Sequence, residues 1–136
     1  MGPFRIDIEV AVPGRHARWT PIRDVVVDTG AELTWLPEDV LRGLGVETFK
    51  THEGFLTADG RLVRRDLGIA LVRHGRFKTV DEIVFAKPGD LTLLGAHTLE
   101  GFNATVDPRR RRLVAGGPMP AACASTCVLA CHQTPC

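Results

Sequence analysis

The sequence contains no tyrosine, and aromatic residues make up only 6% of it. It has no cysteine before Cys123, so no disulfide can cross-link the preceding part of the chain. No apolar run approaches the ~20 residues that a membrane-spanning helix needs, and the N-terminal MGPFRIDIEV lacks a signal-peptide pattern. We therefore expect a cytoplasmic protein with no membrane association.

An excess of charge of one sign is also missing, because the formal net charge is +1. This balance gives no reason to expect a nucleic-acid partner. The run Arg109 to Arg112 is basic, but it alternates across an expected strand and has few aromatic neighbours, which favours a solvated hairpin arm. The histidines show no HExxH or other ligand spacing, so we expect no metal in the core and no cofactor.

The length of 136 residues and the hydrophobic fraction of 44% are those of one ordinary globular domain, which we place at residues 1–115. The composition changes at residues 116–136, where a Gly/Pro linker precedes Cys123, Cys127, Cys131 and Cys136. Spacings of four residues would put three cysteines on one helix face near His132, but the CxxC pattern of zinc sites is missing. We expect a cysteine-rich tail rather than a metal site.

The domain itself has the pattern of many short strands. Residues 4–12, FRIDIEVAV, alternate apolar and polar side chains and predict a half-buried strand, which PGRHARWTP follows as a hairpin loop. The three valines at 25–27 predict a short buried strand. Pro37 predicts the first position of a helix, PEDVLRGLG, that ends at Gly43 and Gly45.

Three further turns divide the rest of the domain into strands. Asp59-Gly60, His74-Gly75 and Asp107-Pro108 each lie between two apolar-rich arms, which is typical of β-hairpins. Between the last two turns, an apolar run, DLTLLG, precedes a short helical pattern, AHTLEGF. The whole pattern predicts an all-β fold, a small closed β-barrel with one or two short helices.

The valine strand ends in a carboxylate, Asp28, followed by Thr29 and Gly30. Burial penalises charge, so a carboxylate at this place either caps a turn or serves chemistry. A strand would fix the position of the carboxylate, the threonine hydroxyl would hold the loop, and the glycine would let a second backbone or a substrate approach. A structural turn at the end of the strand remains the alternative.

The segment VVVDTGAELTWLPEDVLRGLGV resembles the active-site segment of retropepsin-like aspartic proteases, in which an apolar strand delivers Asp-Thr/Ser-Gly-Ala. Downstream, LTLLGAHTLEGFNATVDPRRRRLV is similar to the second marker of that family, where two apolar residues and a glycine, here Leu93-Leu94-Gly95, precede a helix. GFLTADGRLV falls where the family has its flap, a mobile hairpin over the cleft. The resemblance covers residues 4–114 and is closer to the cellular and bacterial single-domain members.

The sequence departs from the retroviral members in two places. Ala96-His97 stands where they often carry an arginine, and the flap tip contains one glycine where theirs are glycine-rich. The resemblance implies a retropepsin-like barrel and an aspartic endopeptidase acting on polypeptides. Its catalytic residues would be Asp28, Thr29 and Gly30, and its substrate-binding residues would be Ala31, Thr57, Ala58, Asp59 and Gly60.

Aspartic proteolysis needs two carboxylates that share one proton, whereas this chain has a single Asp-Thr-Gly. Asp107 does not supply the second, because Pro108 follows it and removes a backbone N–H, which indicates a turn residue. The second carboxylate must come from a second copy, so we expect a C2 homodimer. A catalytically silent dimerisation or peptide-binding module on the same fold is the alternative, and a nucleic-acid-binding β domain is a third.

Overall fold

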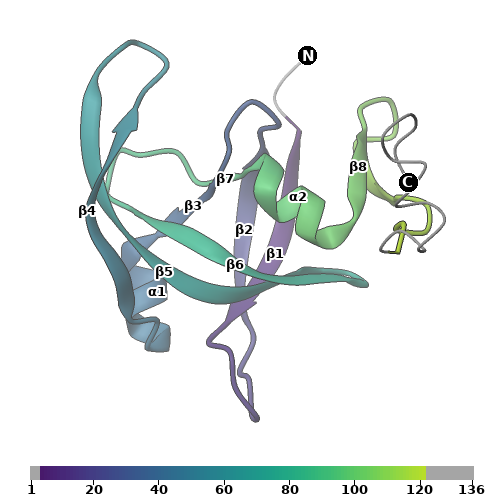
Figure 1. Ribbon diagram of the computed structural model, residues 1–136, viewed down its shortest axis with the longest axis horizontal. Helices are drawn as coiled ribbons and strands as arrows, with labels where there is room; N and C mark the ends of the chain where they lie inside the picture. Colours follow the sequence, from purple (N-terminus) through teal and green to yellow (C-terminus); the bar gives the residue numbers. More distant parts are fainter. Residues whose placement is uncertain (1–3, 122–136) are drawn as a thin grey trace, which may run out of the picture.

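The computed structural model describes residues 4–121 and is mostly β, with two short helices (Figure 1). This confirms the expected all-β class. The strands are β1 (Arg5–Ala11), β2 (Thr20–Val27), β3 (Thr34–Pro37), β4 (Thr48–Leu56), β5 (Leu62–His74), β6 (Phe77–Ala86), β7 (Leu93–Leu94), β8 (Ala104–Asp107) and β9 (Arg112–Ala115). The helices are α1 (Glu38–Leu44) and α2 (Ala96–Phe102).

Seven strands form one sheet in the order β1-β2-β7-β3-β6-β5-β4, and β1 also pairs with β5. The pairing can therefore be followed from β1 through β2, β7, β3, β6 and β5 back to β1, while β4 extends from β5 as the arm of a hairpin. Within residues 4–121, strands β8 and β9 pair only with each other, after α2. Figure 1 shows the β4–β5 hairpin rising at one side of the molecule and the β8–β9 hairpin at the other.

The core lies where these strands turn their apolar faces toward one another. In β1, for example, Ile6, Ile8 and Val10 are buried at alternate positions, which is the period that the sequence predicts for a half-buried strand. Strand β6 is buried on both faces from Ile83 to Ala86; β3 and β5 pair with its two edges, and α2 packs against it. The two helices contribute Leu41, Leu99 and Phe102 to this core.

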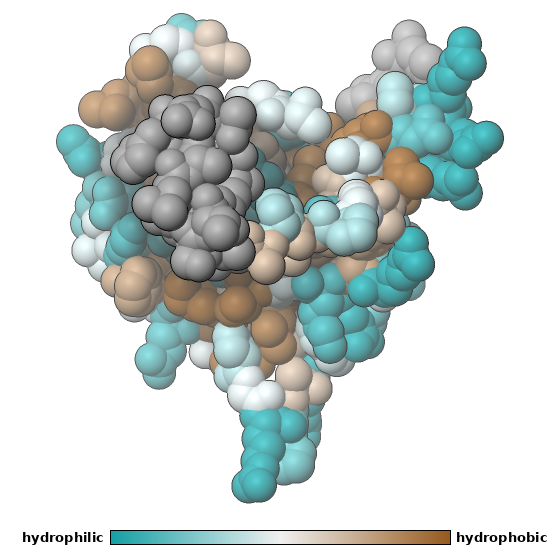
Figure 2. All heavy atoms as spheres, turned by 45° about the vertical axis from the view of Figure 1, so that its right-hand side comes forward, coloured by the Kyte–Doolittle hydropathy of each residue, from teal (hydrophilic) through white to brown (hydrophobic). Residues whose placement is uncertain are grey.

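The predicted hairpins are confirmed. β1 and β2, β4 and β5, β5 and β6, and β8 and β9 each pair antiparallel around the expected turns. Asp107 is a turn residue, as predicted, because its side chain accepts hydrogen bonds from the backbone N–H groups of Arg109 and Arg110. The loop between β1 and β2 projects from the bottom of the molecule, and its tip is hydrophilic (Figure 2).

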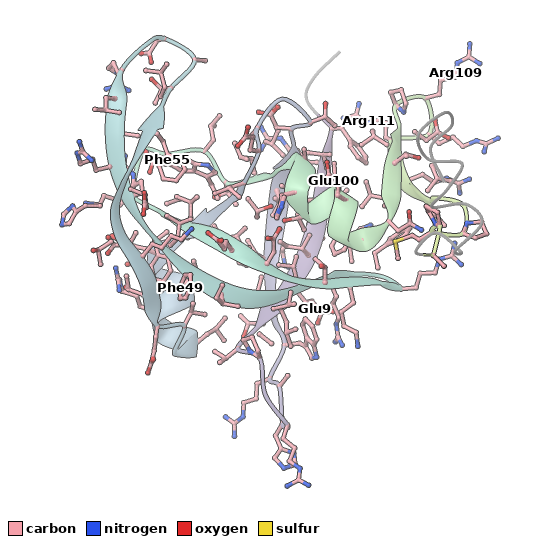
Figure 3. All side chains as sticks on the ribbon, in the orientation of Figure 1. Glu9, Phe49, Phe55, Glu100, Arg109 and Arg111 are labelled. Atoms are coloured by element: carbon pink, nitrogen blue, oxygen red, sulfur yellow. The ribbon has the colours of Figure 1, made fainter. Side chains whose placement is uncertain are left out.

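Two local predictions were wrong, and a third was right in part. Pro37 is not the first helical residue but the last of β3, where it pairs with Ala86, and its ψ of 128° is extended. The helix runs through Gly43 and ends before Gly45, which is its C-cap with a φ of 92°, so of the two predicted terminators only Gly45 is confirmed. The arginine run does not alternate across a strand, because only Arg112 belongs to β9 and the other three form the exposed turn (Figure 3).

Strand β3 was not predicted at all. It is four residues long and takes its partners from distant segments, β6 in parallel and β7 antiparallel, so its own sequence carries little signal. Among residues 4–121, no helix is long and apolar enough to cross a membrane. The predictions for Cys123, Cys127, Cys131 and Cys136 lie outside the described residues.

Candidate active site

Asp28 follows directly after β2, at the point where the buried strand emerges. Val25 is fully buried, Val26, Val27 and Asp28 are half-buried, and Thr29 is exposed. Strands β2 and β7 pair in parallel, with Val26 opposite Leu93 and Val27 opposite Leu94. The backbone N–H of Asp28 continues this ladder by donating to the Leu94 carbonyl at 2.9 Å. The two sequence markers are therefore joined through the backbone of Asp28, the residue that carries the carboxylate.

The Asp28 side chain also organises the turn that follows it. Its Oδ1 accepts a hydrogen bond from the Gly30 N–H at 2.9 Å, and its backbone carbonyl accepts one from Ala31 N–H at 3.2 Å. Within residues 4–121, Oδ2 accepts no hydrogen bond. The carboxylate is thus held by one oxygen while the other is available, and the geometry suits both the capping and the catalytic reading.

The loop after Asp28 is tied to the segment after β7 by two more backbone bonds. Ala96 N–H donates to the Ala31 carbonyl at 2.7 Å, and His97 N–H donates to the Glu32 carbonyl at 2.9 Å. Gly95 approaches this loop so closely that a Cβ there would lie 2.5 Å from the Leu33 carbonyl oxygen. Backbone groups of Ala96 and His97 therefore hold the loop at the place where the sequence has no arginine.

A buried polar cluster lies behind the loop, and sequence reasoning missed it. The hydroxyl groups of Thr34 and Thr98 are 2.6 Å apart, and both residues are fully buried. Thr34 Oγ1 accepts from the Gly95 N–H at 3.0 Å, and Thr98 Oγ1 donates to Asp81 Oδ2 at 3.0 Å. Asp81 lies two residues before Ile83 on β6, so an aspartate on the buried face of an alternating strand was the signal available.

His97 links this cluster to the surface. Its Nδ1 lies 2.9 Å from Asp81 Oδ1, and its side chain is 62% exposed while that of Asp81 is 6% exposed. The hydrogen bond to Asp81, and then the charge of that carboxylate, raise the pKa of His97 above its ordinary value of 6.5. Glu100 and Glu82 raise this pKa further, and burial opposes them.

We predict that His97 titrates above pH 6.5 and that Asp81→Asn brings its pKa back toward that value. Because the folded-state pKa is raised, the interaction stabilises the fold fully below pH 6.5 and is lost as pH rises through the folded-state pKa. The measurement is a histidine NMR titration, with His74, bonded to the Asp7 carbonyl, as the control. A His97 pKa that Asp81→Asn leaves unchanged would contradict the pairing.

The hairpin tip that sequence analysis assigned to substrate binding forms a tight turn. Thr57 N–H donates to the Arg61 carbonyl at 2.8 Å, and Gly60, with φ of 85°, donates its N–H to the Thr57 carbonyl at 2.9 Å. Asp59 accepts from the Thr57 hydroxyl and, at 3.1 Å, from Arg61 Nε. The hydrogen bond from Thr57 is the main cause of a lowered Asp59 pKa.

The two cross-strand pairs next to this turn differ in their contacts. At the tip, the cross-strand pair Leu56 and Leu62 is 75% and 62% exposed, so two large apolar side chains have no cover within the described chain. In the next cross-strand pair, Phe55 and Val63, Phe55 meets Trp35 of β3 edge to face, with ring centroids 5.1 Å apart. Phe55 lies on the side of the hairpin that faces the body of the molecule (Figure 3).

The structure therefore brings together part of the predicted site. Asp28, Thr29, Gly30 and Ala31 lie in one loop against residues 93–97, whereas Thr57, Ala58, Asp59 and Gly60 lie at the end of a separate hairpin. Figure 1 shows the loop after β2 at the top of the view, between this hairpin and the β8–β9 hairpin. Within residues 4–121, no cluster of three or more His, Cys, Asp or Glu side chains could hold a metal ion.

No family model matches the chain, and no curated protein matches its sequence. What can be said of the site thus comes from its residues and its geometry.

Proposed function

We propose that this protein is a homodimeric aspartic endopeptidase on a retropepsin-like closed β-barrel. The observation that carries the proposal is the junction of Asp28-Thr29-Gly30 with Leu94-Gly95 through the Asp28 N–H, reinforced by the backbone bonds from Ala96 and His97. A strand end held in this way keeps a carboxylate in one place, which a reaction that depends on positioned proton transfer requires.

The chemistry would use Asp28 from each of two copies. One carboxylate, ionised, accepts a proton from a water molecule, which attacks the peptide carbonyl carbon. The other, protonated, donates to the carbonyl oxygen, so the pair carries one proton and titrates as a unit. Because close carboxylates cannot both ionise cheaply, this arrangement stabilises the shared proton. The exposed Thr29 and the half-buried Asp28 are accessible to a second copy.

Strand pairing and the hairpin support the rest of the proposal. The ring of pairings from β1 back to β1 through β5 is what a small closed barrel requires. The β4–β5 hairpin has the place and the exposed apolar tip expected of a flap that closes on a peptide. Leu56 and Leu62 would become covered when the flap closes, with Thr57 to Gly60 and Ala31 contacting the substrate.

The test of this proposal is hydrolysis of a mixed peptide library at acidic to mildly acidic pH, with the cleavage products identified by mass spectrometry. We expect turnover that a chelator leaves unchanged and that a pepstatin-like transition-state mimic inhibits. A dimer that binds peptides without cleaving them would instead support the silent module. Salt-sensitive binding of nucleic acid that requires Arg109 to Arg112 would support the third alternative.

We predict that residues 56–63 gain protection from amide hydrogen exchange when such an inhibitor binds. Closure of the hairpin would order its tip and exclude water from its backbone. The β8–β9 hairpin serves as the internal control, because it is also exposed but lies on the other side of the molecule. Unchanged exchange in residues 56–63 with inhibitor demonstrably bound would reduce this hairpin to a surface turn.

A further inference from the structure

We propose that Asp81 is a positioning residue for the Asp28 loop, acting through the hydroxyl groups of Thr98 and Thr34. This inference rests on the proposed function and adds residues that the sequence markers do not include. The chain of contacts runs from Asp81 Oδ2 to Thr98 Oγ1, from there to Thr34 Oγ1, and from there to the Gly95 N–H, with separations of 3.0, 2.6 and 3.0 Å.

The groups at the two ends of this series of hydrogen bonds decide which group donates in each bond. At one end the Gly95 N–H can only donate, so Thr34 Oγ1 must accept from it. At the other end an ionised carboxylate can only accept, so Thr98 Oγ1 must donate to Asp81. Each hydroxyl has one proton, and the Thr34 hydroxyl therefore donates to Thr98. In this single arrangement, every polar group in the series from Asp81 to Gly95 has a hydrogen-bond partner.

Burial makes this arrangement costly to disturb. Thr34 and Thr98 are fully buried, and the Asp81 side chain is 6% exposed, so water cannot replace a lost partner. Asp81 also accepts at Oδ1 from the Glu82 N–H at 2.8 Å, next to His97 Nδ1. The series of hydrogen bonds connects three elements, since Asp81 belongs to β6, Thr98 to α2 and Thr34 to β3.

The series of hydrogen bonds ends at Gly95, which lies next to the groups that hold the Asp28 loop. The carbonyl of Leu94 accepts the Asp28 N–H, and the N–H groups of Ala96 and His97 hold the carbonyls of Ala31 and Glu32. Because Leu94 and Ala96 flank Gly95 in the sequence, the hydrogen bond that holds Gly95 also holds these two residues, which bond to the loop. The close approach of Gly95 to Leu33 leaves little room for the segment to shift without moving the loop as well.

An asparagine cannot replace Asp81 in this role. If its amide NH₂ faced Thr98, the Thr98 hydroxyl would donate to Thr34, and the proton of the buried Thr34 hydroxyl would lose its acceptor. If its NH₂ took the place of Oδ1 instead, it would face the Glu82 N–H. The first orientation leaves a buried donor unsatisfied and the second sets two donors against each other, so a group that only accepts fits this position.

The test uses Thr98→Val, which removes the hydroxyl at nearly constant shape, and Thr98→Ser, which keeps it. Positioning predicts that Thr98→Val lowers kcat by about 10-fold to 100-fold, because small displacements of reacting groups are costly, while KM changes by less than about 2-fold. Thr98→Ser should retain most of the activity. Asp81→Asn should behave as Thr98→Val does, and Glu9→Gln, which alters the pair with Arg73 on β1 and β5, should leave kcat unchanged.

Amide hydrogen exchange provides a readout that does not depend on activity. In Thr98→Val the N–H groups of Asp28, Ala96 and His97 should exchange faster by about 10-fold or more, while those of the β5–β6 ladder keep their rates. If the wild-type protein cleaves no peptide, the proposed function fails, yet this exchange pattern still decides whether Asp81 positions the loop.

Two results would overturn the inference. One is a Thr98→Val protein with wild-type kcat and wild-type exchange at Asp28, Ala96 and His97. The other is faster amide hydrogen exchange throughout the whole protein, together with an unchanged kcat. That result would show that the cluster only stabilises the fold. Should Asp81→Asn fail to fold, the comparison of Thr98→Val with Thr98→Ser decides the question alone.

Discussion

Peptide hydrolysis should disappear in Asp28→Asn protein, with a loss of more than about 100-fold, because an amide can neither accept a proton from water nor hold the shared one. The substitution is close to isosteric. The amide oxygen of asparagine can still accept from the Gly30 N–H, which Asp28 Oδ1 does at 2.9 Å, so the turn should keep its shape. The loss would then report on chemistry rather than on folding.

Asp24→Asn is the matched control for this experiment. Asp24 lies on the same strand, is exposed, and has a φ of 56°, which asparagine also adopts readily. Both variants and the wild type would be compared by hydrolysis of the same library peptide and by thermal unfolding. Activity of Asp28→Asn equal to that of the wild type, or activity that only chelators abolish, would end the aspartic assignment.

Specific activity should fall when the protein is diluted through its dimer dissociation constant, because one chain carries half of the catalytic pair. Isolated monomers should be inactive. The measurement combines activity per chain with the mass distribution from analytical ultracentrifugation over the same concentrations. Activity per chain that stays constant in a demonstrably monomeric sample would contradict the shared site.

Mixing provides the sharper form of this test. When wild type is equilibrated with a ninefold excess of Asp28→Asn protein, random pairing leaves only ~10% of the wild-type chains in dimers with two Asp28 carboxylates. Activity should fall to about that fraction. The same excess of Asp24→Asn protein should not inhibit, since its heterodimers keep both Asp28 side chains. Full activity in the first mixture would show that one chain suffices.

Sequence patterns predicted most of the local structure. The alternation in β1, the turn residues at Asp59-Gly60, His74-Gly75 and Asp107-Pro108, and the AHTLEGF helix all appear where they were expected. Each depends on neighbours within a few residues, such as a glycine that adopts positive φ at position 60 or 75. The errors at Pro37 and in the arginine run arose where the boundary of an element was set by pairing with another strand or by a turn.

The candidate site was predicted in part. The Asp28-Thr29-Gly30 strand end and the Leu93-Leu94-Gly95 segment were recognised separately, and the structure joins them through β2–β7 pairing and the Asp28 N–H. Asp81 was not recognised, although its place on the buried face of β6 was visible in the alternation. The Trp35–Phe55 contact between β3 and the hairpin was not foreseen as a pair either.

The sequence by itself determined the β class of the chain, its hairpins, the α2 helix and the presence of a carboxylate at a strand end, because periodicity and turn chemistry act over a few residues. Only the tertiary structure decided which distant segments meet. Thr34 and Thr98 are 64 residues apart in sequence, and no local pattern marks their hydroxyls as partners 2.6 Å apart. The same holds for β3. Its four residues carry little strand signal, and they form a strand because β6 and β7 provide hydrogen-bond partners on either side.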